Sequence, residues 1–226
     1  MPLFEASRLD ANRNIVSDSG GSKALAVKLL LRFRNGDAGL KAADNRPMIR
    51  LFAALSLPDE AAHALQRRQT GVEGARWRPL ETLHVTLRFF GEIREDIARD
   101  LDGELAAIHQ PPFDLGLAGV GAFGEGADIH ALWAGIAENP DLRRLARACE
   151  TAARRAGLKA DTRQYRPHVT LAYLRRPDPA EVGAWIQANN LLQSPPIRID
   201  RFGLHSSFLG RDQAHYRLEA EYPLLS

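Results

Sequence analysis

The 226-residue chain has little that would support disulfide, metal-cluster or membrane chemistry. Its single cysteine, Cys149, excludes an intramolecular disulfide and a cysteine-based zinc site. No apolar run is long enough to span a bilayer, and the first twenty residues lack the charged start and apolar centre of a secretion signal. We therefore expect a monomeric cytoplasmic protein with no membrane attachment, no cofactor and no metal.

The chain also lacks the basic excess of proteins that coat long stretches of nucleic acid. The formal net charge is only +2. Residues 1–47 hold eight basic and five acidic residues, which leaves 22 basic and 23 acidic residues from Met48 onward. Any contact with RNA is therefore expected to be local, at an end of the strand.

The first 47 residues differ in character from the rest. Residues 17–22 read as a linker, and residues 35–39 contain a second run of turn-forming residues. We predict that residues 1–47 are a poorly ordered N-terminal extension and that residues 48–226 form one folded domain. A regulatory or targeting arm is the alternative for the extension.

From residue 48 the hydrophobic pattern becomes regular. Strand patterns cover residues 49–57, 83–90, 113–123, 129–136, 169–174, 198–206 and 214–222, and helix patterns cover residues 58–69, 94–109, 142–156 and 179–188. Several strands follow one another through short turns, and no glycine-rich phosphate loop follows the first strand. The order predicts an α+β fold with antiparallel pairing rather than a doubly wound parallel sheet.

A repeated tetrapeptide is the most informative feature of the chain. The sequence His-Val-Thr-Leu begins at His84 and again at His168, both times on a predicted strand. Side chains alternate between the two faces of a strand, so each copy presents its histidine and threonine on one face and its valine and leucine on the other. Two such strands side by side would give one cleft with two imidazoles and two hydroxyls.

That set of groups suits phosphoryl chemistry at neutral pH. A free imidazole titrates near pH ~6.5, so one ring can act as a base while the other acts as an acid. Threonine hydroxyls can donate hydrogen bonds to the oxygens on which charge develops. A lone strand histidine is usually structural or simply exposed, and a short repeat can arise by chance or by duplication. Neither reading explains a histidine on the polar face twice.

The chain resembles the two-histidine (2H) phosphoesterase superfamily, specifically the LigT-like RNA 2′,3′-cyclic phosphodiesterases, whose members carry two His-x-Thr motifs. The similarity extends over residues 48–225. It includes the opening strand at residues 49–55, the run Trp77-Arg78-Pro79 before the first motif, and the residues Leu204, Ser206, Tyr216 and Pro223-Leu224 near the end.

The resemblance implies a bilobal α+β fold, with two pseudo-symmetric antiparallel-sheet lobes, helices outside and a central cleft. It implies hydrolysis of a terminal RNA 2′,3′-cyclic phosphate to a 2′-phosphate. His84 would be the proton donor and His168 the proton acceptor, with Thr86 and Thr170 holding the phosphate. The implied partners are RNA ends, tRNA halves among them. The alternatives are 2′–5′ RNA ligation, a small nucleotide-derived cyclic phosphate as substrate, and a non-catalytic module that binds RNA ends.

One position departs from the family pattern. Several members carry a basic residue two positions after the leucine of the second motif, where this chain has Tyr173. Arg88 follows the alternation of the first motif but lies toward the far end of its strand, so the phosphate-binding arginine is not identified by the sequence. Tyr173 and Trp77 are candidates for stacking on a nucleobase, with packing in the protein interior as the alternative for each.

Overall fold

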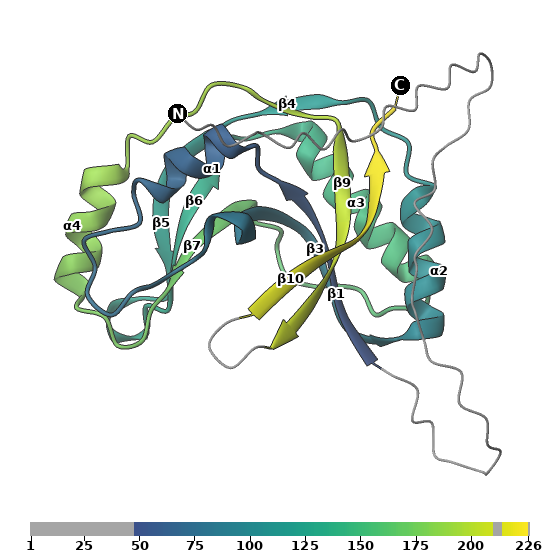
Figure 1. Cartoon of the computed structure of the whole chain (residues 1–226), viewed down its shortest axis with the longest axis horizontal. Helices are drawn as coiled ribbons and strands as arrows, with labels where there is room; N and C mark the ends of the chain where they lie inside the picture. Colours follow the sequence, from purple (N-terminus) through teal and green to yellow (C-terminus); the bar gives the residue numbers. More distant parts are fainter. Residues whose placement is uncertain (1–47, 210–213, 226) are drawn as a thin grey trace, which may run out of the picture.

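The computed structural model describes residues 48–209 and 214–225 (Figure 1). The predicted N-terminal extension, residues 1–47, lies outside the described residues. None of the described helices is long and apolar enough to cross a membrane.

Strands and helices interleave as the sequence pattern predicts. The strands are β1 (Met48–Ser56), β2 (Arg76–Trp77), β3 (His84–Arg94), β4 (Phe113–Leu115), β5 (Leu117–Phe123), β6 (Ala131–Ile136), β7 (His168–Tyr173), β8 (Ile197–Ile199), β9 (Arg201–Leu209) and β10 (Ala214–Pro223). The helices are α1 (Asp59–Gln66), α2 (Glu95–Ala106), α3 (Pro140–Arg155) and α4 (Pro179–Asn189), with short 3-10 turns η1 (Leu80–Thr82) and η2 (Gly126–Asp128). The predicted α+β class is confirmed.

Local sequence explains where the two helices of the second half begin. The Asn139 side chain accepts a hydrogen bond from the backbone N–H of Leu142 at the start of α3. The Asp178 side chain accepts one from Ala180 at the start of α4. A proline occupies the first turn of both helices, where its missing N–H removes no hydrogen bond.

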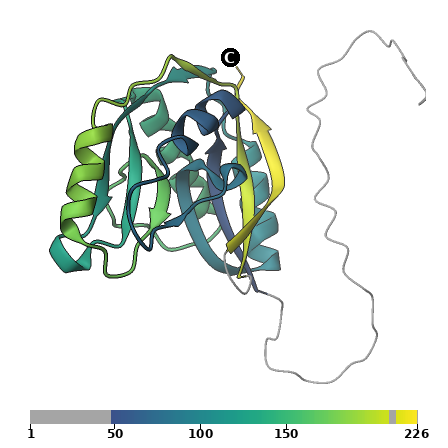
Figure 2. The same cartoon turned by 60° about the vertical axis from the view of Figure 1, so that its left-hand side comes forward.

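The main sheet has two parts that meet at the motif strands. One part has the order β10-β9-β1-β3, and the other has the order β7-β6-β5, with β2 also pairing with β7. In Figure 1 the two parts form an arc, with α2 and α3 beside the first part and α1 and α4 beside the second. The turned view in Figure 2 also places α4 and β10 at opposite flanks. The expected two lobes are present, and they share one continuous antiparallel sheet.

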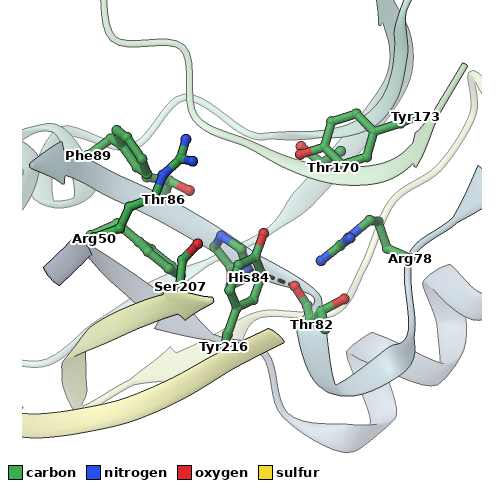
Figure 3. Close-up of a pocket in the computed structure, with 11 residues that line it drawn as sticks. Arg50, Arg78, Thr82, His84, Thr86, Phe89, Thr170, Tyr173, Ser207 and Tyr216 are labelled. Carbon is green, nitrogen blue, oxygen red and sulfur yellow. Dashed lines mark hydrogen bonds between the residues drawn. The ribbon is translucent and has the colours of Figure 1, made fainter. Parts of the chain in front are cut away.

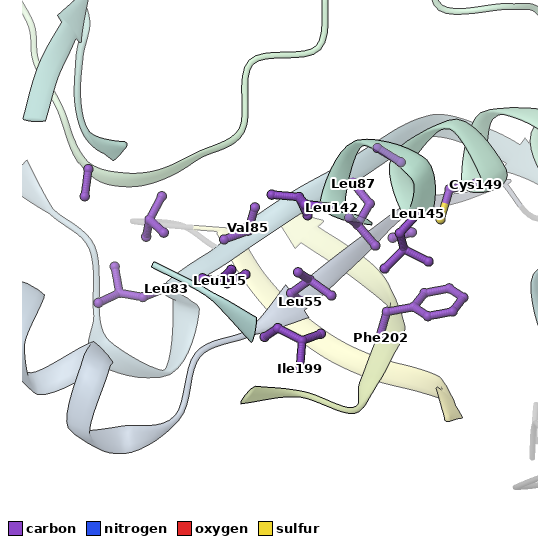
Figure 4. Close-up of a cluster of buried hydrophobic side chains, with 14 of the residues drawn as sticks. Leu55, Leu83, Val85, Leu87, Leu115, Leu142, Leu145, Cys149, Ile199 and Phe202 are labelled. Carbon is purple, nitrogen blue, oxygen red and sulfur yellow. The ribbon is translucent and has the colours of Figure 1, made fainter. Parts of the chain in front are cut away.

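The hydrophobic core explains which way the motif side chains face. Val85 and Leu87 of β3 are buried and cluster with Leu142 and Leu145 of α3 (Figure 4). Full burial of such a side chain stabilises a fold by about 1.5–3 kcal/mol. Because strand side chains alternate, this packing turns His84 and Thr86 to the opposite face, away from α3.

One strand ends later than the sequence pattern predicts. The predicted strand over residues 83–90 runs on to Arg94, because a bulge at Gly91 lets the pairing with β1 continue. Gly91 has a φ of 79°, a conformation that glycine adopts without strain.

The predicted strand over residues 113–123 is two strands. Its first part, β4, pairs with β8 in a separate two-stranded sheet, and its second part, β5, pairs with β6. The predicted strand over residues 198–206 is likewise divided between β8 and β9. At each division the chain passes from one sheet to the other. A hydrophobic pattern shows which residues are buried, but not the sheet to which a strand belongs.

Candidate active site

The two His-Val-Thr-Leu segments lie side by side on β3 and β7. These strands are antiparallel and share one registered pair, Val85 opposite Val169. Continuing this register places His84 across from Thr170 and His168 across from Thr86. Both valines are fully buried, whereas the histidines and threonines are half-buried. The arrangement is a local pseudo-twofold centred on the two valines.

A cleft of about 270 Å³ opens over these strands. Four of the predicted site residues line it: His84, Thr86, Thr170 and Tyr173. Figure 3 shows His84 between two groups of side chains, with Arg50 and Phe89 on one side and Arg78 and Tyr173 on the other. The remaining lining residues are Phe52, Thr82, Ser207 and Tyr216, so no carboxylate of residues 48–209 or 214–225 lines this cleft.

His168 lies at the margin of the same site. It is not among the residues that line the cleft, and its ring packs edge-to-face on Phe123 with 4.8 Å between centroids. Its positive form is close enough to lower the pKa of His84. The two imidazoles are therefore near enough to interact electrostatically.

Both imidazoles are oriented by the same local hydrogen bond. The Nδ1 of His84 lies 2.7 Å from the carbonyl oxygen of Thr82, and that of His168 lies 2.7 Å from the carbonyl oxygen of Arg166. A carbonyl only accepts, so each Nδ1 carries a proton and each Nε2 is left for other partners. The exposed His109 makes the same bond to Ala107. This hydrogen bond therefore fixes the tautomer of a histidine but does not mark it as functional. The motif histidines differ from His109 in their position at the cleft.

Burial lowers the pKa of both motif histidines. The pKa of His84 is lowered from 6.5 to about 4, mainly because the ring is withdrawn from water, with smaller contributions from the nearby charges of His205, Arg78 and His168. The hydrogen bond to the Thr82 carbonyl opposes this change. Burial also lowers the pKa of His168, against the hydrogen bond to Arg166. Both rings are therefore neutral near pH 7 in the free protein.

Several cleft residues were not predicted from the sequence. Arg78 follows β2 and enters the cleft between Tyr173 and Tyr216. Arg50 lies over the ring of Phe89 at 5.1 Å. A usable signal for Arg50 was its place as a charged residue inside an otherwise apolar strand. Arg78 belongs to the run Trp77-Arg78-Pro79 that carries the resemblance, but no spacing or alternation marked it as a cleft residue.

Aromatic rings form much of the wall around His84. Phe52 is buried, lies 5.0 Å from the His84 ring and stacks on His205 at 5.3 Å. Tyr216 meets His84 edge-to-face at 5.3 Å. These contacts hold the imidazole in place and keep water from its sides, which accounts for the large effect of burial on its pKa.

The structure places Trp77 and Arg88 outside the cleft. Trp77 packs on Trp185 of α4 with 6.1 Å between ring centroids and does not line the cleft. Its environment is therefore that of a residue packed against the protein interior, the alternative to stacking on a nucleobase. The Arg88 guanidinium forms ion pairs with Glu150 and Asp161. Tyr173 is 47% exposed and lines the cleft, which leaves its ring available to a ligand.

Metal-ligating side chains are scattered in the described part of the chain. Within residues 48–209 and 214–225, no group of three or more histidine, cysteine, aspartate or glutamate side chains could hold a metal ion. Cys149 is buried in α3, and burial raises the pKa of its thiol. It therefore does not supply a thiolate at neutral pH.

Paired His-x-Thr strands beneath one cleft, in a two-lobed α+β fold, define the class of two-histidine phosphoesterases. A family model described as the 2′-5′ RNA ligase superfamily matches residues 57–208, more than half of the chain. The chain belongs to this superfamily.

Relatives and solved structures agree with this assignment. An Archaeoglobus fulgidus protein named RNA 2′,3′-cyclic phosphodiesterase is 29% identical over 134 residues, which is 58% of this chain and 76% of the relative. A Geobacillus stearothermophilus protein of the same name is 32% identical over 127 residues, which is 54% of this chain but only 40% of the relative. The crystal structure of E. coli LigT with 3′-AMP matches with a TM-score of 0.63 and 26% identity, covering 80% of this chain and 100% of LigT. A Thermus thermophilus structure matches with a TM-score of 0.66 and 25% identity, covering 78% of this chain and 98% of that one.

Proposed function

We propose that this protein is an RNA 2′,3′-cyclic phosphodiesterase that uses His84 and His168 as an acid–base pair. The observation that carries the proposal is the pairing of Val85 with Val169, because it sets both His-x-Thr segments beneath one cleft. The names of the curated relatives support the substrate.

The proposed reaction adds one water across the bond between phosphorus and the 3′ oxygen. The Nε2 of His168 takes a proton from the water as its oxygen attacks phosphorus. The bond to the 3′ oxygen breaks, and His84 gives that oxygen a proton. The products are a 2′-phosphate and a free 3′-hydroxyl. Thr86 and Thr170 donate hydrogen bonds to the non-bridging oxygens, where charge increases in the transition state.

The size and lining of the cleft favour a strand end as the ligand. At about 270 Å³ it lies near the lower limit of small-molecule sites, ~300–1,000 Å³. It therefore holds a terminal nucleotide rather than a length of strand, with the Tyr173 ring available to the base. We further propose that the protein is a monomer that acts in the cytoplasm on RNA-processing ends such as those of tRNA halves, without a metal.

The direct test is hydrolysis of a short RNA with a terminal 2′,3′-cyclic phosphate in the presence of excess chelator. We expect turnover by the wild type and at least a ~100-fold loss for His84→Ala and for His168→Ala, in the range of general acid–base effects. His109→Ala is the matched control, because this histidine has the same local hydrogen bond but is exposed and belongs to neither motif. Full turnover by both motif variants would reject the proposal.

The separate roles of the two histidines require a second substrate. Sulfur at the 3′ position gives a leaving thiol with a pKa near ~8.5, which departs with little need of a proton. His84→Ala should therefore recover much of its activity on the 3′-thio cyclic phosphate, whereas His168→Ala should not. The opposite pattern would exchange the two roles.

The superfamily description favours 2′–5′ RNA ligation as the second candidate. The same histidines would serve, with a 5′-hydroxyl taking the place of water as the nucleophile. Incubation with paired tRNA halves separates the two candidates, because ligation yields a longer strand with a 2′–5′ linkage and hydrolysis yields a 2′-phosphate end.

A further inference from the structure

Arg78 carries a buried positive charge that no acidic residue balances in the described part of the chain. The residue is only 7% exposed, and its Nη2 atom has no hydrogen-bond partner there. Its charge lowers the pKa of His84, which places the guanidinium close to that imidazole. A buried ion without a partner is strongly unfavourable, so a group absent from the free protein is expected to complete the site.

The main chain holds Arg78 firmly while the side chain enters the cleft. The Arg78 N–H donates to the Leu171 carbonyl at 2.8 Å, and the Gln69 amide donates to the Arg78 carbonyl at 2.9 Å. The guanidinium then lies 5.6 Å from the centre of the Tyr173 ring and 5.4 Å from that of Tyr216. Figure 3 shows it pointing toward His84 from the side of the second lobe.

The surroundings of Arg78 fit an anionic ligand. The rings of Tyr173 and Tyr216 contact the faces of a cation well but leave N–H groups at its edge without acceptors. Among the described residues, the lining of the cleft contains no carboxylate that could accept hydrogen bonds from those groups. A guanidinium presents a planar fork that matches two oxygens of a phosphate. Arg88 is the contrasting case, because its guanidinium is paired with two carboxylates outside the cleft.

We infer that Arg78 binds the anionic phosphate group of the ligand, beside His84 and opposite the Thr86 end of the cleft. The identification of that phosphate as the reacting group rests on the proposed function, whereas the presence of an anion site does not. Binding would place the negative charge next to both Arg78 and His84. Arg78 would thereby offset charge on the phosphate while His84 acquires the proton that it later gives up.

The test compares adenosine 2′-monophosphate with adenosine, so that the contribution of the phosphate is measured by difference. Titration calorimetry on the wild type should show tighter binding of the monophosphate. In Arg78→Met this preference should fall by about 10- to 100-fold, the range for hydrogen bonds to charged groups. Arg78→Lys, which keeps the charge but loses the fork, should lie between the two. Arg147→Met, at an exposed position on α3, is the control and should match the wild type.

Thermal unfolding without ligand separates ligand binding from a structural role. If Arg78 serves the ligand, Arg78→Met removes an unpaired buried charge, and its Tm should equal or exceed that of the wild type. If the contacts with the two tyrosines are the reason for the residue, its Tm should fall. A lowered Tm, an unchanged phosphate preference in Arg78→Met, or a wild type with no phosphate preference would each overturn the inference.

Hydrolysis of the RNA cyclic phosphate is measured on the same variants. A wild type that prefers the monophosphate through Arg78 but hydrolyses no cyclic phosphate would reject the proposed function and leave the anion site intact. An Arg78→Met variant with wild-type kcat/KM would reject Arg78 as a ligand of the reacting phosphate and leave the proposed function intact.

Discussion

Anion binding in the cleft should greatly increase the proton affinity of His84. In the free protein, burial lowers its pKa to about 4, so the ring is almost entirely neutral at pH 7 and is a poor proton donor. One negative charge ~4 Å away, at an effective dielectric constant of ~20, contributes about 4 kcal/mol. That energy corresponds to about a thousandfold tighter proton binding, because each factor of ten requires ~1.4 kcal/mol. The bound phosphate would thus bring the pKa of His84 from about 4 to the neutral range.

The measurement is an NMR titration of the histidine rings, with and without saturating sulfate. Sulfate keeps its charge over the whole pH range of the titration, so any titration that is observed comes from the protein and not from the ligand. The resonances of His84 are assigned with His84→Gln. We expect His84 to titrate near pH 4 in the free protein, and we expect its pKa to rise by at least the calculated amount with sulfate bound. An ordinary pKa for free His84, or no response to sulfate, would refute the assignment of this residue as a proton donor switched on by its ligand.

Three further predictions concern stability and reactivity. The pKa of His84 in the folded protein lies below its unfolded value of 6.5, so between these two values the unfolded state binds more protons than the folded state. The free energy of unfolding should therefore fall by about 3 kcal/mol as the pH drops from ~6.5 to ~4. Urea titrations at several pH values should show a smaller fall for His84→Gln, and an equal fall would contradict this account. The Cys149 thiol, buried with a raised pKa, should react with iodoacetamide only at the rate of unfolding; rapid labelling of folded protein would disprove its burial. The Tyr165 hydroxyl donates to the Thr86 carbonyl at 3.1 Å, so Tyr165→Phe should lower stability by ~1 kcal/mol in urea unfolding. Unchanged stability would show that this link between β3 and the segment before β7 contributes nothing.

The sequence predicted those parts of the site that depend on one strand at a time. Alternation along residues 84–87 and 168–171 was enough to place Val85 and Val169 inside and the histidines outside, because burial of apolar side chains leaves only one face for the polar ones. The repeat supplied the reason to expect both strands at one place. The strand that was predicted to stop at Gly91 continued, because the pairing with β1 outweighed the local turn preference of glycine.

The residues that no pattern revealed are those whose setting comes from several elements. Arg78 is unusual neither in type nor in spacing, and it becomes a candidate ligand only because β7, β10 and the segment after β2 enclose it without an acidic partner among the described residues. The packing of Trp77 on α4 was equally hidden, since stacking on a base and packing on a helix demand the same residue type.

By itself, the amino-acid sequence determined the α+β class, the two motif strands and the face on which their histidines lie. These follow from hydrophobic periodicity, which is a property of short segments. The tertiary structure alone decided that the two lobes share one sheet and that His84 is buried enough to be neutral. It also placed beside His84 a guanidinium that has no acidic partner among the described residues. Burial and charge pairing are sums over neighbours distant in the chain, so they exist only once those neighbours have been brought together.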